Sequence, residues 1–299
     1  MSSAEKKPSK VILWSTPRSL SSALTKCLSF VPDSVIWFEP YMGAMYYGTD
    51  SRYSSMVWKD KPKSQDSKTK QPKSIHLPED KGYDVTKSSY KWCQSQLEAE
   101  YLGKRVVFVK EISCAITTRF DAIPSGYKHS FIIRNPLKVL PSWKRAQHNT
   151  GLNGPYEEYT LKDSNIPASG YFFKESYDLY QHIKENYESN PIILDADDLL
   201  MNPGGILKAY CNAMDIPYTD DLLHWDSSGD VIRTWNIRRN FLDVDQSEAL
   251  SFMGTAVSSS EFLEPTKGPS RDNLAEEELK CVDFCMPYYE KLYEKRLIC

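Results

Sequence analysis

The sequence predicts an α/β fold: a single domain over residues 1–299, with a central parallel β-sheet and helices on both of its faces. Short apolar runs such as VILWS (11–15) and RVVFV (105–109) alternate with segments of helical pattern. This alternation is typical of βαβ units. Hydrophobic residues make up 40% of the chain, enough for a sizeable core. No linker divides the alternation after Lys73, so we expect one domain.

The expected elements follow one another regularly along the chain. Strands are expected at residues 11–15, 34–38, 105–109, 128–133 and 191–194. Helices are expected at residues 21–28, 88–102, 136–148, 171–187, 204–214 and 275–296. Parallel strands end at one edge of a sheet, and open α/β sheets bind their ligands at that edge. The residues that follow each strand are therefore the first candidates for a site.

Charge and composition exclude several classes of function. A generic duplex DNA binder carries a basic excess, whereas this chain has a net charge of -3, so we expect no nucleic-acid partner. No run reaches the ~18 apolar residues of a membrane-spanning helix, and the polar start MSSAEKKPSK is unlike a signal peptide, so no membrane association is expected. The seven scattered cysteines include no CxxC pair. We expect a cytoplasmic protein with reduced thiols and without a metal site.

Two segments are predicted to lie outside the packed domain. Residues 1–10 are polar and charged, which predicts a flexible N-terminus. Residues 59–73, KDKPKSQDSKTKQPK, hold six lysines and no large apolar side chain, which predicts a mobile lysine-rich loop. Runs of this kind usually face solvent, so a solvated linker is favoured over a functional basic patch.

The first anion-binding segment follows the first expected strand. In VILWSTPRSLSSAL (11–24) the strand breaks at Pro17, and polar side chains follow at the start of a helix: Arg18, Ser19, Ser21 and Ser22. Free backbone N–H groups and the helix dipole attract anions there, and Arg18 adds a permanently charged fork. The pattern GxxxxGK[ST] is absent, which disfavours a Walker A nucleotide site. An N-capped helix with an incidental arginine is the alternative.

The second anion-binding segment is FIIRNPLKVLPSWKR (131–145). An apolar strand ends at Arg134, and Pro136 suits the first turn of the helix that follows. Two helical turns bring Ser142 back toward the strand end, so Arg134 and Ser142 can hold one phosphate between them. The alternative is an arginine that pairs with a carboxylate.

Together these segments resemble the sulfotransferases that use 3′-phosphoadenosine 5′-phosphosulfate (PAPS). The loop after the first strand is similar to their 5′-phosphosulfate loop, and RNPxxVxxS to their 3′-phosphate motif; LDADDLLMNPGGILKAYCNAMDIPY (194–218) resembles the strand, acidic turn and helix that follow. The resemblance covers most of residues 11–218. It implies a P-loop sulfotransferase-like fold and a PAPS cofactor held by Pro17, Arg18, Ser19, Leu20, Ser21, Ser22, Arg134 and Ser142.

The chain departs from the family in two places. Leu20 replaces the glycine common in the phosphosulfate loop, and Arg18 replaces the lysine usual in the cytosolic branch. The late RKG-type loop of that branch has only possible stand-ins here, namely the Thr266–Lys267–Gly268 run and the Arg238–Arg239 pair. From the resemblance we carry over Lys267 and Ser258 as further cofactor contacts.

The resemblance also implies catalytic roles. Sulfuryl transfer requires donor and acceptor in line and charge neutralisation at the bridging oxygen, which arginine, lysine and backbone donors can supply without a metal. Arg18 is expected on the leaving phosphate, and Lys110 at the carboxyl end of the third strand. Glu39, in WFEPY, is expected to be the general base, as a glutamate in this region is in some branches. Glu111 is a second acidic candidate; the remaining candidates are His76, His148 and His224. A surface lysine and a turn-capping glutamate are the alternative readings of Lys110 and Glu39.

The run YMGAMYY (41–47) follows Glu39 directly. Its aromatic and methionine side chains predict an acceptor pocket lined by Tyr41, Met42, Met45 and Tyr46, although core packing accounts for them equally well. The predicted activity is metal-free sulfuryl transfer from PAPS to a hydroxyl or amine of a small molecule. A P-loop kinase or NTPase and an inactive nucleotide-binding module are the alternatives. The acceptor and the oligomeric state stay open.

Overall fold

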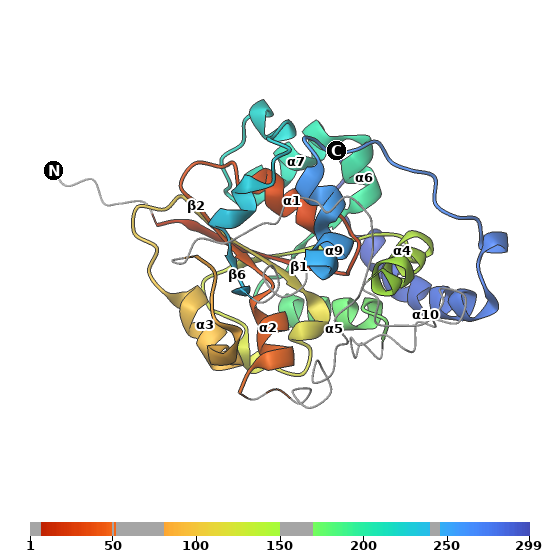
Figure 1. Ribbon diagram of the computed structural model, residues 1–299, viewed down its shortest axis with the longest axis horizontal. Coiled ribbons are helices and arrows are strands. Elements are labelled where there is room, and N and C mark those ends of the chain that lie inside the picture. Colours follow the sequence, from red (N-terminus) through yellow and green to blue (C-terminus); the bar gives the residue numbers. More distant parts are fainter. Residues whose placement is uncertain (1–6, 50, 52–80, 150–169, 240–245) are drawn as a thin grey trace.

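Six parallel strands form the centre of the described part of the molecule (Figure 1). They are β1 (Ser9–Ser15), β2 (Ser34–Phe38), β3 (Val106–Ile112), β4 (Lys128–Ile133), β5 (Ile192–Asp195) and β6 (Asn236–Ile237). Their order in the sheet is β5-β4-β1-β3-β2-β6, and every pairing is parallel. The predicted α/β class with a central parallel sheet is confirmed.

A computed structural model describes residues 7–49, 51, 81–149, 170–239 and 246–299. The lysine-rich segment 59–73, His76 and the first six residues lie outside these ranges. Of the predicted flexible N-terminus, residues 1–10, Ser9 and Lys10 belong to β1. None of the helices in the described ranges has the length and hydropathy needed to span a bilayer.

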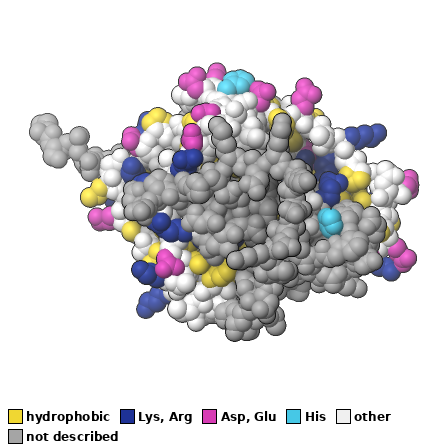
Figure 2. All heavy atoms as spheres, viewed as in Figure 1, with side chains coloured by type: hydrophobic (Ala, Val, Ile, Leu, Met, Phe, Trp, Pro, Cys, Tyr) yellow, Lys and Arg dark blue, Asp and Glu magenta, His cyan; other side chains and the backbone are white. Residues whose placement is uncertain are grey.

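Helices cover both faces of the sheet (Figure 1). On one face lie α2 (Pro40–Tyr47), α3 (Tyr90–Glu98), α4 (Pro136–His148), α5 (Phe173–Asn186) and α10 (Glu276–Tyr293). On the other lie α1 (Ser21–Leu28), α6 (Ala196–Met201), α7 (Pro203–Ala213) and α9 (Gln246–Ser258). Figure 2 shows basic and acidic side chains interspersed over the described surface of one side of the molecule.

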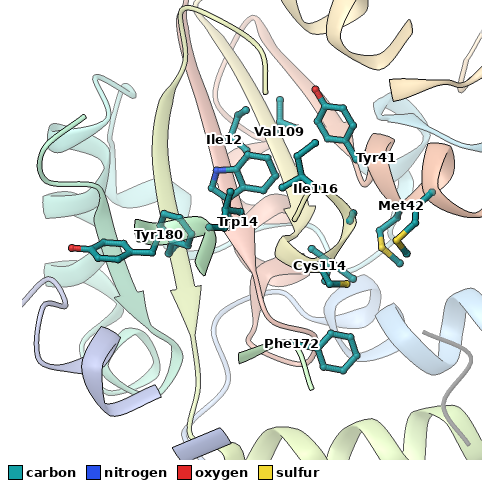
Figure 3. Close-up of a cluster of buried hydrophobic side chains, with 14 of the residues drawn as sticks. Ile12, Trp14, Tyr41, Met42, Val109, Cys114, Ile116, Phe172 and Tyr180 are labelled. Atoms are coloured by element: carbon teal, nitrogen blue, oxygen red, sulfur yellow. The ribbon is translucent and has the colours of Figure 1, made fainter. Parts of the chain in front are cut away.

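The alternation of side chains along β1 builds two hydrophobic cores. Ile12 and Trp14 belong to the cluster beneath α2 and α3, part of which Figure 3 shows, whereas Val11 and Leu13 belong to the cluster beneath α1 and α7. All four side chains are fully buried. A strand that is covered on both faces is apolar at every position, which is why this one appeared in the sequence as a continuous apolar run.

The third strand is longer than the sequence indicated. β3 continues through Ile112, so the prediction that Lys110 ends the strand is wrong. Two consecutive charged residues resemble the end of a strand in sequence. Here the Lys110 ammonium pairs with Glu39, and the Glu111 carboxylate accepts backbone N–H bonds, so both stay buried inside the strand.

Among the α-helices and strands of the described residues, the sequence did not predict α2, α6, α9 and β6. Every residue of α2 from Pro40 to Tyr46 is buried, so the helix has no polar face to give a helical period. β6 contains two residues, too few for a pattern. α6 is a single short helix joined to α7 through Asn202.

Strained backbone gathers at the carboxyl edge of the sheet. Arg18, Leu20 and Glu39 have φ of 59°, 72° and 54°, although none is glycine. Arg18 and Leu20 follow β1, and Glu39 follows β2. Left-handed backbone at a residue with a side chain costs about 1–2 kcal/mol and tends to cluster at functional sites. This edge is therefore the first place to look for a site.

Candidate functional site

A pocket of about 260 Å³ lies beside the first turn of α1. Segments remote in the sequence line it: the loop after β1, the end of β4 with α4, and the region from α9 to Thr266. The residues that it takes from the two predicted anion-binding segments are Arg18, Leu20, Ser21, Ser22, Arg134 and Ser142. The structure thus brings together most of the residues that the sequence predicted for the cofactor.

The loop after β1 leaves the helix N-terminus open. Leu20 is the N-cap residue of α1, and no side chain caps the helix, so the N–H groups of its first turn are not occupied by a capping side chain. The Ser19 hydroxyl donates instead to the Thr16 carbonyl oxygen at 2.7 Å, which stabilises the bend of the loop. The alternative of a serine-capped helix is not what the structure has. An uncapped helix N-terminus beside an arginine attracts anions.

Arg18 joins the two predicted segments. Its Nε donates to Ser142 Oγ at 3.0 Å, across 124 residues of sequence, and its Nη1 donates to the Phe252 carbonyl oxygen at 2.6 Å. Burial lowers the pKa of Arg18, and the charges of Arg134 and Arg145 lower it further. Three like charges near one pocket are mutually unfavourable, and an anion bound there would relieve the repulsion.

Arg134 both lines the pocket and pairs with a carboxylate. Its Nε donates to Asp197 Oδ1 at 3.2 Å, and its Nη1 lies 3.5 Å from the Arg18 carbonyl oxygen. Asp197 also forms an ion pair with Lys138, whose Nζ lies 2.8 Å from Oδ2. The phosphate-binding and carboxylate-pairing readings of Arg134 are therefore compatible in this geometry.

The far wall of the pocket is fixed to α1 by Lys26. This residue is fully buried, and its Nζ donates to the carbonyl oxygens of Val257 and Ser259 at 2.6 and 2.8 Å. A cation at the carbonyl end of a helix is stabilising, so Lys26 holds the end of α9 against α1.

The late residues carried over from the resemblance are placed around this wall. Ser258 is exposed and donates to Gly254 O at 2.9 Å, and its neighbour Ser259 lines the pocket instead. Lys267 is exposed, while Thr266 lines the pocket. Contact of Ser258 and Lys267 with a cofactor stays a prediction.

Glu39 was predicted as the general base and Lys110 as a separate catalytic lysine. In the structure their side chains form an ion pair. The side chains are 13% and 4% exposed, and the Lys110 Nζ lies 4.7 Å from the centroid of the Phe38 ring. The Glu39 N–H donates to the Lys110 carbonyl oxygen at 2.8 Å, which extends the β2–β3 pairing by one bond. Neither side chain is among those that line the 260 Å³ pocket.

Glu111 serves the backbone of α2. Its Oε2 accepts from the N–H groups of Tyr41 and Met42 at 2.6 and 3.3 Å, and its Oε1 accepts from the Ile112 N–H at 2.8 Å. Burial, and secondarily the charge of Glu39, raises the pKa of Glu111 to about 8. This fully buried carboxyl anchors the start of α2.

The four residues predicted for the acceptor pocket lie in the core. Tyr41, Met42, Met45 and Tyr46 are all buried in the cluster beneath α2 and α3. Figure 3 shows Tyr41 and Met42 among its side chains, and the Tyr41 hydroxyl donates to the Ala122 carbonyl oxygen at 2.6 Å. Core packing, the alternative reading, describes their observed contacts; an acceptor-binding role stays a prediction.

Sequence reasoning missed several residues of the site. Lys26 lies within the expected helix 21–28, where nothing in the sequence distinguished it from a surface lysine. Phe252 belongs to α9, a helix that was not expected. Asp197 and Lys138 stood inside quoted motifs, and their pairing follows only from the adjacency of β4 and β5. Charged residues at the ends of neighbouring strands were the available signal for that pair.

Comparison with known proteins gives distant relatives. No family model matches the chain. Branched-chain-amino-acid aminotransferase-like protein 2 of Arabidopsis thaliana is 24% identical over 284 residues, which cover 93% of this chain and 40% of that protein. Protein 1 of the same name and organism is 22% identical over 219 residues, which cover 73% and 32%. The chain spans less than half the length of these curated relatives.

Several solved structures follow a similar course of the chain. The sulfotransferase domain from the curacin biosynthetic pathway matches with a TM-score of 0.45 and 14% identity, over 93% of this chain and 98% of that one. The sulfotransferase domain from the Synechococcus PCC 7002 olefin synthase matches at 0.48 and 13%, over 95% and 96%. Mouse sulfotransferase SULT7A1 complexed with PAP matches at 0.46 and 13%, over 96% and 86%. Likeness at this level does not assign the chain to a family.

Proposed function

We propose that the chain is a PAPS-dependent sulfotransferase, an enzyme that moves a sulfuryl group in line and without a metal to a hydroxyl or amine of a small-molecule acceptor. The observation that carries this proposal is the convergence of two motifs. Arg18 with the first turn of α1, and Arg134 with Ser142, line one pocket although the sequence separates them. Two remote anion-binding segments on one pocket suit a ligand with two separate phosphate groups.

The donor set of the pocket fits such a nucleotide. The open N-terminus of α1 and the Arg18 guanidinium would hold the 5′-phosphosulfate, and Arg134 with Ser142 would hold the 3′-phosphate. Leu200, Phe252 and Phe262 supply apolar surface to the same pocket, as a purine ring requires. When bound, PAPS supplies an activated sulfuryl group on a phosphate leaving group.

Arg18 would stabilise the charge that grows on the leaving oxygen. Its Nε and Nη1 bonds to Ser142 and Phe252 fix the guanidinium before the reaction, so little reorganisation is needed as charge develops. This interaction strengthens only in the transition state and therefore would raise turnover more than affinity.

Glu39 would accept the proton of the acceptor. In the transfer, the acceptor oxygen or nitrogen forms a bond to sulfur, the bond from sulfur to the phosphate oxygen breaks, and the acceptor proton goes to the Glu39 carboxylate. Lys110 holds that carboxylate in one orientation through the ion pair at the end of β2. Base assistance of this kind is worth roughly 10²–10⁴-fold in rate.

The buried ion pair is also an observation against an inactive nucleotide-binding module. Apolar residues of similar size would often stabilise a fold as well as a buried pair does, so a binding module has no need of Glu39 and Lys110. A P-loop kinase or NTPase would need a lysine at the end of the loop, where Ser21 and Ser22 stand. The aminotransferase-like proteins that the chain resembles in sequence are more than twice as long as this chain, so their name is not evidence for an aminotransferase activity here.

The state of the cysteines bears on the compartment in which the protein works. No disulfide joins the seven cysteines, all of which lie in the described residues. We propose a reducing, cytoplasmic setting on this ground.

A turnover assay tests the function. The chain is incubated with PAPS and a panel of phenols, alcohols and amines in the presence of a chelator, and sulfated product is measured by mass spectrometry. We expect a sulfated product and a matching release of adenosine 3′,5′-bisphosphate, both lost in Arg18→Ala. Binding of the cofactor without product from any acceptor would favour the inactive module, and Mg²⁺-dependent consumption of ATP would favour the kinase.

A further inference from the structure

Three aspartates stand at the end of β5 and in the first turn of α6, namely Asp195, Asp197 and Asp198, and their carboxylates contact different groups. Asp195 Oδ1 accepts from the N–H groups of Asp197 and Asp198 at 2.9 and 3.2 Å, which caps α6. Asp195 Oδ2 accepts from the Tyr289 hydroxyl of α10 at 3.1 Å. The first turn of α6 is therefore fixed by β5 on one side and by α10 on the other.

Asp197 points from this fixed turn to the cations beside the pocket. Its Oδ1 accepts from Arg134 Nε at 3.2 Å, and its Oδ2 lies 2.8 Å from Lys138 Nζ. The side chains of Arg134 and Asp197 are only 17% and 21% exposed, so solvent screens the pair weakly. The carboxylate thus contacts Nε, and the Arg18 carbonyl oxygen lies 3.5 Å from Nη1, while the Arg134 side chain lines the pocket.

Lys138 is held in the same arrangement from the other side. A Cβ on Gly268 would lie 2.9 Å from Lys138 Cγ, so the backbone at Gly268 passes directly against the lysine stem. Thr266, two residues earlier, lines the pocket. Asp197 thus connects Arg134 of one pocket wall with the segment that forms another wall.

We propose that Asp197 is a positioning residue that fixes Arg134 for the second phosphate of the nucleotide and so sets the preference for a 3′-phosphorylated ligand. The inference rests on the proposed function, which supplies the nucleotide. A free arginine loses rotamer entropy when it binds, and fixing the side chain beforehand removes that cost. The carboxylate is also a negative charge near a phosphate, which would repel it. The two effects have opposite signs, so one substitution decides between them.

The experiment measures binding by calorimetry for two ligands, adenosine 3′,5′-bisphosphate and adenosine 5′-monophosphate. Asp197→Asn is compared with Asp198→Asn, a matched control. Asp198 is adjacent, has a similar exposure of 25% and pairs with Arg296 at 2.6 Å. Each variant removes one negative charge from the same turn, but only the first releases Arg134.

We expect Asp197→Asn to weaken binding of the bisphosphate at least tenfold and of the monophosphate less than twofold. Asp198→Asn should keep the wild-type ratio of the two affinities within twofold. Tighter bisphosphate binding by Asp197→Asn would show that the carboxylate competes with the phosphate, and equal weakening for both ligands would show a general structural role. Either result overturns the inference.

A second variant covers the case in which Asp197→Asn does not fold. Asp197→Glu keeps a carboxylate but moves it by one methylene, so we expect the affinity ratio to fall three- to tenfold with little change in melting temperature. An unchanged ratio in a folded Asp197→Glu protein would overturn the positioning role. A wild-type protein that does not distinguish the two ligands would contradict the proposed function itself, and the inference with it.

Discussion

The two ends of the sheet's carboxyl edge differ in the signs of the charges that they bring together. At β1 and β4, burial lowers the pKa of Arg18, and the charge of Arg134 lowers it further. At β2 and β3, Glu39 and Lys110 are of opposite sign and neutralise each other in a buried pair. The first end borders the pocket, whereas at the second end the side chains of Lys110 and Glu39, 4% and 13% exposed, contact each other.

The two ends are therefore expected to differ in how they bind a ligand. At the first end Asp197 contacts both Arg134 and Lys138, and Glu261 and Glu264 also line the pocket. Arg18 is still repelled by Arg134 and Arg145, and an anion bound beside it would relieve that repulsion. The second end has its charges in place before any ligand arrives, which suits a group that must hold one orientation during a reaction. Binding energy is expected to come from the first end and chemical selectivity from the second.

The largest expected effect is on turnover. Glu39→Gln keeps the size of the side chain and one acceptor oxygen but cannot take a proton, so turnover of an aliphatic alcohol should fall roughly 10²–10⁴-fold while affinity for adenosine 3′,5′-bisphosphate stays unchanged. An acidic phenol should lose less, because it gives up its proton more readily. Steady-state rates and calorimetry check both parts. Full activity of Glu39→Gln would remove Glu39 as the base and leave the pocket assignment intact.

The next effect separates the two ends by stability. Lys110→Met leaves the Glu39 carboxylate in its site without its partner, so the free energy of unfolding should fall by about 3–5 kcal/mol. Arg18→Met removes one of three like charges at the loss of two hydrogen bonds, so the change should stay within about 1.5 kcal/mol. Urea denaturation measures both. Equal losses at the two ends would contradict the contrast drawn between them.

The pH dependence of stability tests the anchoring of α2. The pKa of Glu111 is raised from its ordinary value of 4.5 to about 8 in the folded protein, so the folded state binds more protons in that range and loses stability as pH rises. The slope from this group is at most about 1.4 kcal/mol per pH unit. Glu111→Gln should remove it. Unfolding curves between pH 5 and 8 that show the same slope in both proteins would rule this group out as the cause.

The smallest expected effect concerns the strained loop at the pocket. Leu20 adopts a φ of 72°, a conformation that favours glycine. Both Leu20→Gly and Leu20→Ala lose the packing of the leucine side chain, but only glycine relieves the backbone, so the glycine variant should be more stable by about 1 kcal/mol. Thermal unfolding of the two variants measures the difference. The usual order, with alanine more stable than glycine, would show that the loop is not strained at this residue.

Much of this arrangement could be predicted from the sequence. The apolar runs of β1, β2 and β4 and the proline that starts α4 are local signals, and they predicted the strands and the residues that follow them. The pairing of Glu39 with Lys110 depends on the register of β2 and β3, and that of Arg134 with Asp197 on the adjacency of β4 and β5. No local pattern specifies either contact. The fully buried helix α2 was missed because a segment without a polar face has no helical period to detect.

In the proposed function, the pocket beside α1 binds an adenosine nucleotide with both a 5′- and a 3′-phosphate. Thermal unfolding in the presence of adenosine 3′,5′-bisphosphate, ATP with Mg²⁺, and adenosine 5′-monophosphate tests it most directly. A ligand at one hundred times its Kd stabilises the native state by about 2.7 kcal/mol, which corresponds to roughly 4 °C for a chain of 299 residues. We expect a shift of that order with the bisphosphate and much smaller shifts with the other two ligands at the same concentration. A larger shift with ATP and Mg²⁺ than with the bisphosphate would contradict the claim.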